Sequence, residues 1–117
     1  MRYLTVFYGA EREDAPGEDE IEAMGAFMNE LGEAGYLLVA DGLLPSTKGV
    51  KVRKDGDEFK VIDGPFAEAK EILGGFAIVD VPSIDVAIDI TKRFMAIGGD
   101  GMCEVREMYP ESAFPPA

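Results

Sequence analysis

The 117-residue sequence contains no histidine, no tryptophan and only one cysteine. Without histidine, the chain lacks the side chain that most readily exchanges protons near neutral pH and most commonly binds metals. Cys103 has no partner for a disulfide within the chain, and its alternating apolar and charged surroundings favour a small buried residue over a reactive thiol. D-x-D-x-D-G, G-x-G-x-x-G and phosphate-loop patterns are also missing. We therefore expect no bound metal and no nucleotide cofactor.

Positive charge is scarce, because the chain has 11 lysines and arginines but 23 aspartates and glutamates, which gives a net charge of -12. Such a chain repels phosphate backbones and anionic lipid, so we expect neither nucleic acid nor a membrane as a partner. The longest apolar run, YLLVA, is far shorter than the roughly 20 residues that cross a bilayer. The first residues have no apolar core of signal-peptide length, and we expect a cytoplasmic location.

The composition is that of an ordinary globular protein, with 47% hydrophobic and 29% charged residues. At this length we expect one domain spanning residues 1–117. Such a domain buries about two-thirds of the surface that its unfolded chain exposes, which is enough for a core without disulfides.

The first half of the chain alternates between strand and helix patterns. Residues 1–8 predict a strand with Tyr3 and Phe7 on one face and apolar side chains on both. An acidic link then leads into a helix that ends near Gly35. Its apolar stripe is Ile21, Met24, Phe27, Met28 and Leu31.

Residues 36–44 predict a second strand, in which Asp41 makes a turn and which Pro45 closes. A hairpin follows, because Asp55-Gly56 separates two alternating runs and is a preferred pair for a type I′ turn. Counting outward from that turn predicts the pairs Lys54–Asp57, Arg53–Glu58, Val52–Phe59, Lys51–Lys60 and Val50–Val61.

The second half repeats the strand and helix order. Residues 75–81 and 102–109 predict strands, and between them Ser83 caps a helix that stops at Gly98-Gly99. The apolar stripe of this helix is Ile84, Ala87, Ile88, Thr91, Phe94 and Met95.

The element order is β-α-β, hairpin, β-α-β, which predicts a ferredoxin-like α+β fold with two helices on one face of an antiparallel sheet. The other face of such a sheet is bare, and its apolar residues favour packing against a second copy. We expect a homodimer.

A short central segment, DGPFAEAKE at residues 63–71, resembles the D-G-P-F-x-E-x-K-E signature of the DGPF subgroup of YCII-related proteins. LGGF follows it, as in that family, and the similarity extends from RYLTVFYG to GDGMCEVREMYPESAF. The resemblance implies the dimeric α/β-barrel form of the ferredoxin-like fold. It implies no particular reaction, although some DGPF proteins lie beside extracytoplasmic-function sigma factors. Other YCII-related proteins are thought to use a His-Asp pair, for which this chain has no histidine.

The same segment supplies the candidate site. In a functional interpretation Phe66 walls a pocket, Asp63 is the candidate catalytic carboxylate, and Lys70 and Glu71 bind a small polar ligand with Tyr8. In a structural interpretation Asp63 forms an Asx turn, Phe66 fills the barrel and the charged residues pair in solvent.

Two functions from different classes remain open. The first is a small-molecule-binding protein or a lyase- or isomerase-like enzyme with this pocket. The alternative is a non-enzymatic regulatory or interaction module linked to sigma-factor signalling. A cavity beside the central segment would favour the first.

Overall fold

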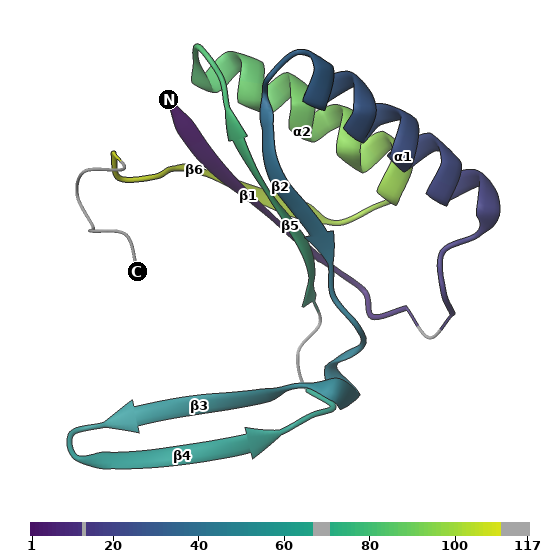
Figure 1. Cartoon of the computed structure of the whole chain (residues 1–117). Helices are drawn as coiled ribbons and strands as arrows, with labels where there is room; N and C mark the ends of the chain where they lie inside the picture. Colours follow the sequence, from purple (N-terminus) through teal and green to yellow (C-terminus); the bar gives the residue numbers. More distant parts are fainter. Residues whose placement is uncertain (13, 67–70, 111–117) are drawn as a thin grey trace.

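The computed structural model describes residues 1–12, 14–66 and 71–110 of the chain (Figure 1). Its elements, in order, are β1 (Arg2–Gly9), α1 (Glu18–Glu33), β2 (Leu37–Gly42), the 3-10 turn η1 (Ser46–Lys48), β3 (Val50–Asp55), β4 (Glu58–Asp63), β5 (Ile72–Asp80), α2 (Ile84–Gly98) and β6 (Met102–Glu107). Within the described ranges, no helix is long and apolar enough to cross a membrane.

Four strands form an antiparallel sheet in the order β2-β5-β1-β6, and β3 and β4 form a separate two-stranded hairpin. Both helices lie on one side of the sheet, and the hairpin projects from the other side (Figure 1). The predicted ferredoxin-like α+β fold is therefore confirmed.

The central strand β1 has two distinct faces, as its sequence predicts. Tyr3 and Thr5 are buried against the helices, opposite the buried residues Val79 and Ala77 of β5. The alternate residues of β1 point to the face without helices, which we call the bare face. Directly paired strand residues share a face, so the bare face carries Leu4, Val6, Tyr8, Val39, Phe76 and Ile78.

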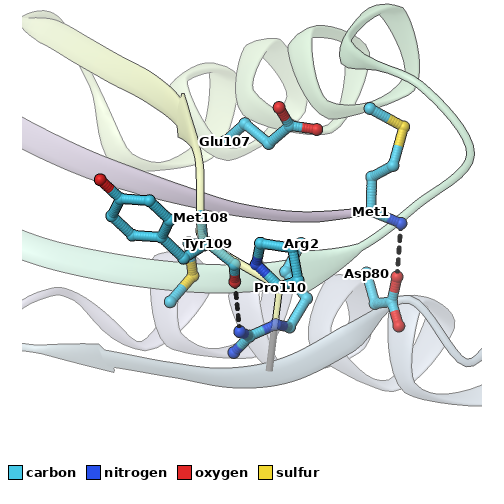
Figure 2. A pocket seen from close by; sticks show the side chains of 7 residues that line it. All are labelled: Met1, Arg2, Asp80, Glu107, Met108, Tyr109 and Pro110. Atoms are coloured by element: carbon cyan, nitrogen blue, oxygen red, sulfur yellow. Dashed lines mark hydrogen bonds and ion pairs between the residues drawn. The ribbon is translucent and has the colours of Figure 1, made fainter. Parts of the chain in front are cut away.

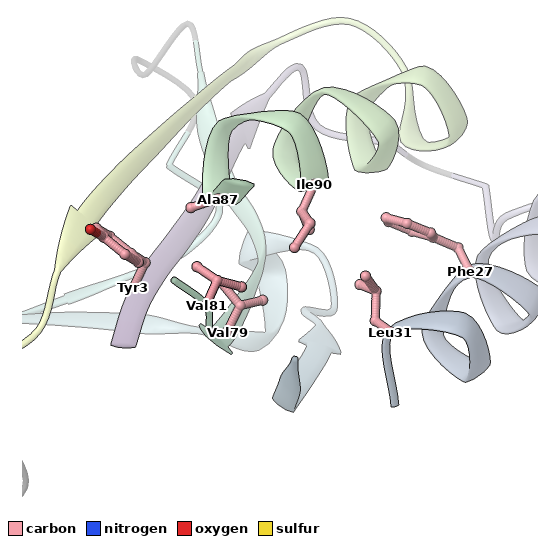
Figure 3. Packing of buried hydrophobic residues seen from close by; sticks show 7 residues of the cluster. All are labelled: Tyr3, Phe27, Leu31, Val79, Val81, Ala87 and Ile90. Carbon is pink, nitrogen blue, oxygen red and sulfur yellow. The ribbon is translucent and has the colours of Figure 1, made fainter. Parts of the chain in front are cut away.

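The core lies between the sheet and the two helices (Figure 3). Its buried members are Tyr3, Val79 and Val81 from the sheet side, with Phe27 and Leu31 from α1 and Ala87 and Ile90 from α2. The rings of Phe27 and Phe94 meet edge to face, with centroids 4.8 Å apart. Each large apolar side chain buried here stabilises the fold by about 1.5–3 kcal/mol.

The apolar stripes of both helices were predicted only in part. Ile21 is 59% exposed, and Ile84 and Ile88 are 41% and 38% exposed, so their predicted burial was wrong. Helix α2 packs through the predicted Ala87, Thr91 and Phe94, and also through Ile90, which the prediction left out. These residues have the spacing i, i+3, i+4, i+7. Ile84, Ile88 and Ile90 are all apolar, so the sequence alone does not show which of them faces the core.

The ends of both helices follow the predicted caps. Gly35, at φ +77°, donates its N–H to the Gly32 carbonyl, and Tyr36 donates to the Leu31 carbonyl. These two bonds form a Schellman motif, which satisfies carbonyls that the helix leaves unpaired. At the start of α2 the Ser83 hydroxyl accepts a hydrogen bond from the Val86 N–H at 3.4 Å.

The hairpin forms where it was predicted, but in a different register. Its central turn residues are Gly56 and Asp57, and the predicted Asp55-Gly56 turn was wrong. The observed pairs are Asp55–Glu58, Lys54–Phe59, Arg53–Lys60, Val52–Val61, Lys51–Ile62 and Val50–Asp63. A type I′ turn needs positive φ at both central residues, whereas type II′ needs it only at the first. Gly56 has φ +60°, and among the described residues every positive φ belongs to a glycine, so φ is not positive at Asp57. The observed turn therefore meets the requirement of type II′ and not that of type I′.

The second strand is shorter than predicted. It ends at Gly42, which pairs with Gly75, rather than at residue 44. Asp41 pairs with Phe76 inside this strand, so the turn predicted there was wrong. Pairing with β5 keeps Asp41 in an extended backbone conformation, although Asp-Gly is a common turn sequence.

The two glycines at the end of α1 predict opposite effects of alanine. Gly35→Ala should destabilise the protein by about 1–2 kcal/mol, because a Cβ is disfavoured in the left-handed region. Gly32→Ala should stabilise it by about 0.5–1 kcal/mol, because Gly32 lies in the helix and a Cβ there meets nothing within 4 Å. Urea unfolding measures both, and effects of the same sign would contradict the cap.

Candidate functional site

A cleft of about 610 Å³ lies between the base of the hairpin and one end of the sheet. Tyr8 reaches it from β1, Phe66 from the segment after β4, and Glu71 from the residue before β5. These are three of the five site residues predicted from the sequence, and the fold brings them to one cavity although Tyr8 and Glu71 lie far apart in the chain.

The walls of the cleft are mostly apolar, and its charged groups are few. Among the described residues, seven with apolar side chains line it: Leu43, Leu44, Pro45, Val50, Phe66, Ile72 and Leu73. Three described charged residues join them, namely Lys48, Lys51 and Glu71. An apolar cavity with a few polar groups is the usual form of a small-molecule site.

Ser46 joins three parts of the chain at the floor of this region. It is 6% exposed, and both its N–H and its hydroxyl donate to the Glu11 carboxylate, the hydroxyl at 3.0 Å. The same hydroxyl accepts a hydrogen bond from the Phe66 N–H at 3.1 Å. Ser46 therefore ties Phe66 to the link that follows β1.

Gly64 packs its backbone directly against this turn. A Cβ at Gly64 would lie 1.7 Å from the Ser46 carbonyl oxygen, so only glycine fits. Its N–H donates to the Gly49 carbonyl at 3.0 Å, which closes the base of the hairpin. The glycine of the DGPF segment thus has a packing role that also places Phe66.

The Phe66 ring meets a cation from the hairpin. The Lys51 ammonium lies 4.3 Å from the ring centroid, in the range of a cation–π contact. Such a contact is worth about 0.5–1 kcal/mol at an exposed position. It holds positive charge at the aromatic wall of the cleft.

The other predicted site residues are placed differently. Asp63 ends β4, is exposed, and does not line the cleft as far as the structure describes it. Its carboxylate makes no hydrogen bond or ion pair with a described residue. Lys70 lies outside the described residues, as does Glu68. No group of three acidic or thiol side chains that could hold a metal occurs in residues 1–12, 14–66 and 71–110, and the expected lack of a metal stays a prediction.

Sequence reasoning missed Ser46, Glu11, Lys48 and Lys51. The first two show no pattern, because their contact joins residues 35 positions apart. The lysines had a visible signal: residues 48–54, KGVKVRK, contain four cations in a chain of net charge -12.

A second cavity, of about 400 Å³, lies where β1 and β6 meet the end of β5 (Figure 2). Three of the four charged groups that line it have partners, Glu107 being the exception among the contacts that the structure gives. The Met1 ammonium contacts the Asp80 carboxylate at 3.0 Å, and the Arg2 guanidinium donates to the Tyr109 carbonyl at 2.7 Å. We therefore regard the cleft at Phe66 as the stronger candidate site.

Cys103 and the acidic end of β6 show no sign of catalysis. Cys103 is half-buried opposite Phe7, and desolvation raises the pKa of its thiol, which keeps it in the unreactive form near neutral pH. Glu104 and Arg106 form an exposed ion pair, as their spacing on the strand predicts.

Comparisons with known proteins agree with the fold. A family model described as YCII-related domain matches residues 1–112. An uncharacterized protein of Rhizobium meliloti (strain 1021), R00369, is 37% identical over 94 residues, covering 78% of this chain and 76% of that protein.

One similar solved structure is that of 5-chloro-2-hydroxyhydroquinone dehydrochlorinase (TftG) from Burkholderia phenoliruptrix AC1100, in complex with 2,5-dihydroxybenzoquinone. It superimposes with a TM-score of 0.51 at 19% sequence identity, over 97% of this chain and 98% of that one. At this identity the likeness supports the fold.

Gly64 and Gly49 form a matched pair for testing the base of the cleft. Gly64→Ala should lower the free energy of unfolding by about 3 kcal/mol or more. The added Cβ would overlap the Ser46 carbonyl, which is backbone and cannot rotate away as a side chain can. Gly49→Ala should change stability by less than about 0.5 kcal/mol, because its Cβ would meet the Ser46 carbonyl oxygen at an ordinary 3.7 Å. Urea unfolding compares the two, and equal losses would refute the contact.

Proposed function

The chain belongs to the YCII-related domain family, and from this premise we propose that it binds a small polar organic molecule in the cleft at Phe66. The observation that carries the proposal is the meeting of Tyr8, Phe66 and Glu71 at one cavity. Its volume of about 610 Å³ matches ordinary ligand sites, which measure roughly 300–1,000 Å³.

We also assign the chain to the DGPF subgroup of this family. The support is the segment Asp63–Gly64–Pro65–Phe66, in which two residues have defined contacts. Gly64 allows close backbone packing, and the Phe66 N–H is bonded to Ser46. Both contacts shape the cleft, which accounts for a glycine and an aromatic residue at this spacing.

Enzymatic activity of a lyase or isomerase kind is part of the proposal. Such reactions move a proton, and with no histidine the task falls to carboxylates or to the Tyr8 hydroxyl. Glu71 lines the cleft, and Asp63 lies three positions before Phe66. The solved neighbour TftG is itself a dehydrochlorinase with a small polar ring compound bound, a ligand of the size proposed here.

A homodimer is the assembly that we propose. The bare face of the sheet carries a run of apolar residues, and Val39 on it is 43% exposed. Packing two such faces together would remove that surface from water. A cytoplasmic location stays a prediction from the sequence.

A thermal-shift screen of small organic acids, alcohols and quinones tests the binding proposal. A compound that stabilises the wild type should bind at least about tenfold more weakly to Phe66→Ala, which removes one wall of the cleft. Phe59→Ala is the matched control, because Phe59 is 68% exposed on the hairpin and does not line the cleft. Equal losses in both variants, or no stabilising compound at all, would favour the regulatory or interaction module.

Asp63→Asn, measured with the same compound, separates the two roles of Asp63. We expect the variant to fold with a loss under about 1 kcal/mol, since Asp63 is exposed and its carboxylate makes no hydrogen bond with a described residue. Binding should change by less than about twofold, because Asp63 is exposed and does not line the described part of the cleft. A sharp loss of binding would instead show that Asp63 is the working carboxylate, because the amide carries no charge and cannot act as a base.

Dimerisation is tested by light scattering during size-exclusion chromatography. The wild type should elute at about twice the chain mass of 12.6 kDa at micromolar concentration. Val39→Lys should weaken the dimer at least tenfold or so, because it places a charge in the apolar contact. Ile84→Lys is the control, being 41% exposed on α2 at the far side of the sheet. A monomeric wild type would contradict the dimer.

A further inference from the structure

We propose that the cleft selects an anionic organic molecule with an apolar or aromatic body, and that Lys51, with Lys48, holds the negative charge. This inference rests on the binding function proposed above and specifies its ligand class. It depends on where the chain places its few cations.

The charge near the cleft is opposite to that of the whole chain. The protein has a net charge of -12, yet the described charged residues lining the cleft are two lysines and one glutamate. A neutral or cationic ligand would gain nothing from this reversal. An anion would be repelled by most of the surface and attracted at this one place.

Within the part of the chain that the structure describes, the two lysines also have no acidic partners. Elsewhere Arg12, Arg93 and Arg106 each pair with a glutamate. By contrast, neither Lys48 nor Lys51 forms an ion pair with any residue that the structure describes. In a chain with twice as many acids as bases, unpaired cations at a cavity are available to an incoming anion.

The position of Lys51 defines what the rest of the ligand must be. Its ammonium lies over the Phe66 ring, at 4.3 Å from the centroid, so charge and aromatic surface are adjacent. The remaining walls are mostly aliphatic, and include Leu43 and Leu73. A carboxylate or phenolate on a flat apolar body would place its charge at Lys51 and its body on these walls. Partial exclusion of water there strengthens the charge interaction.

The hairpin extends the positive region beyond the cleft. Arg53 lies two residues after Lys51, on the same face of β3, and pairs directly with Lys60 of β4. Like charges directly opposite each other destabilise a hairpin. These cations form a strip that leads to the cleft and would attract anionic ligands toward it.

The test uses naphthoate and its neutral isostere naphthamide, with affinities from NMR titration at low ionic strength. Wild type should bind naphthoate about tenfold more tightly than naphthamide. Lys51→Met should weaken naphthoate binding about fivefold or more and change naphthamide binding by less than twofold. Lys51→Arg, which keeps the charge, should restore most of the preference.

Lys54→Met is the control for overall charge. Lys54 lies on the same strand but on the opposite face, outside the lining of the cleft, so its loss should change naphthoate binding by less than twofold. Equal binding of the two probes, with both weakened in Phe66→Ala, would overturn the anion preference and leave the binding function standing. Failure of both probes to bind at millimolar concentration would overturn the inference together with an aromatic-binding cleft.

Discussion

The contact between the backbones of Ser46 and Gly64 is the constraint on which the candidate site depends. It brings the turn η1, which precedes the hairpin, against Gly64, which directly follows the hairpin, at a separation that leaves no room for a Cβ. The Ser46 side chain then links Glu11 to the Phe66 N–H. Through these bonds, one buried serine fixes the base of the hairpin, the aromatic wall of the cleft and the link after β1.

The composition of the chain gives this arrangement its chemical character. Without histidine, the proton transfer that we propose for the cleft would use groups such as Glu71 and the Tyr8 hydroxyl. With acids in twofold excess, the lysines at the cleft stand out as a local reversal of charge. An apolar cavity with a cation on an aromatic wall is suited to recognising one end of a ligand by charge and the other by shape.

Much of the fold could be predicted because its signals are local. Gly35 and Ser83 mark helix ends through contacts within a few residues, and the alternation around Tyr3 marks the two faces of β1. The prediction failed where two local solutions compete. The segment around Gly56 can form two turns that differ by two residues in register, and the requirement for positive φ at glycine alone selected the observed one.

The sequence by itself determined the order of elements, the ferredoxin-like architecture and three of the residues that meet in the cleft, because periodicity, caps and the DGPF segment are properties of neighbouring residues. Only the tertiary structure decided that α2 buries Ile90 while Ile84 and Ile88 stay exposed, that Ser46 supports Phe66, and that Lys51 lies over the Phe66 ring. At the cleft, the contacts of Phe66 with Lys51 and Ser46, and of Ser46 with Glu11, join residues 15 to 35 positions apart. No pattern among neighbouring residues encodes contacts over such separations, because they depend on how the sheet and the hairpin pack.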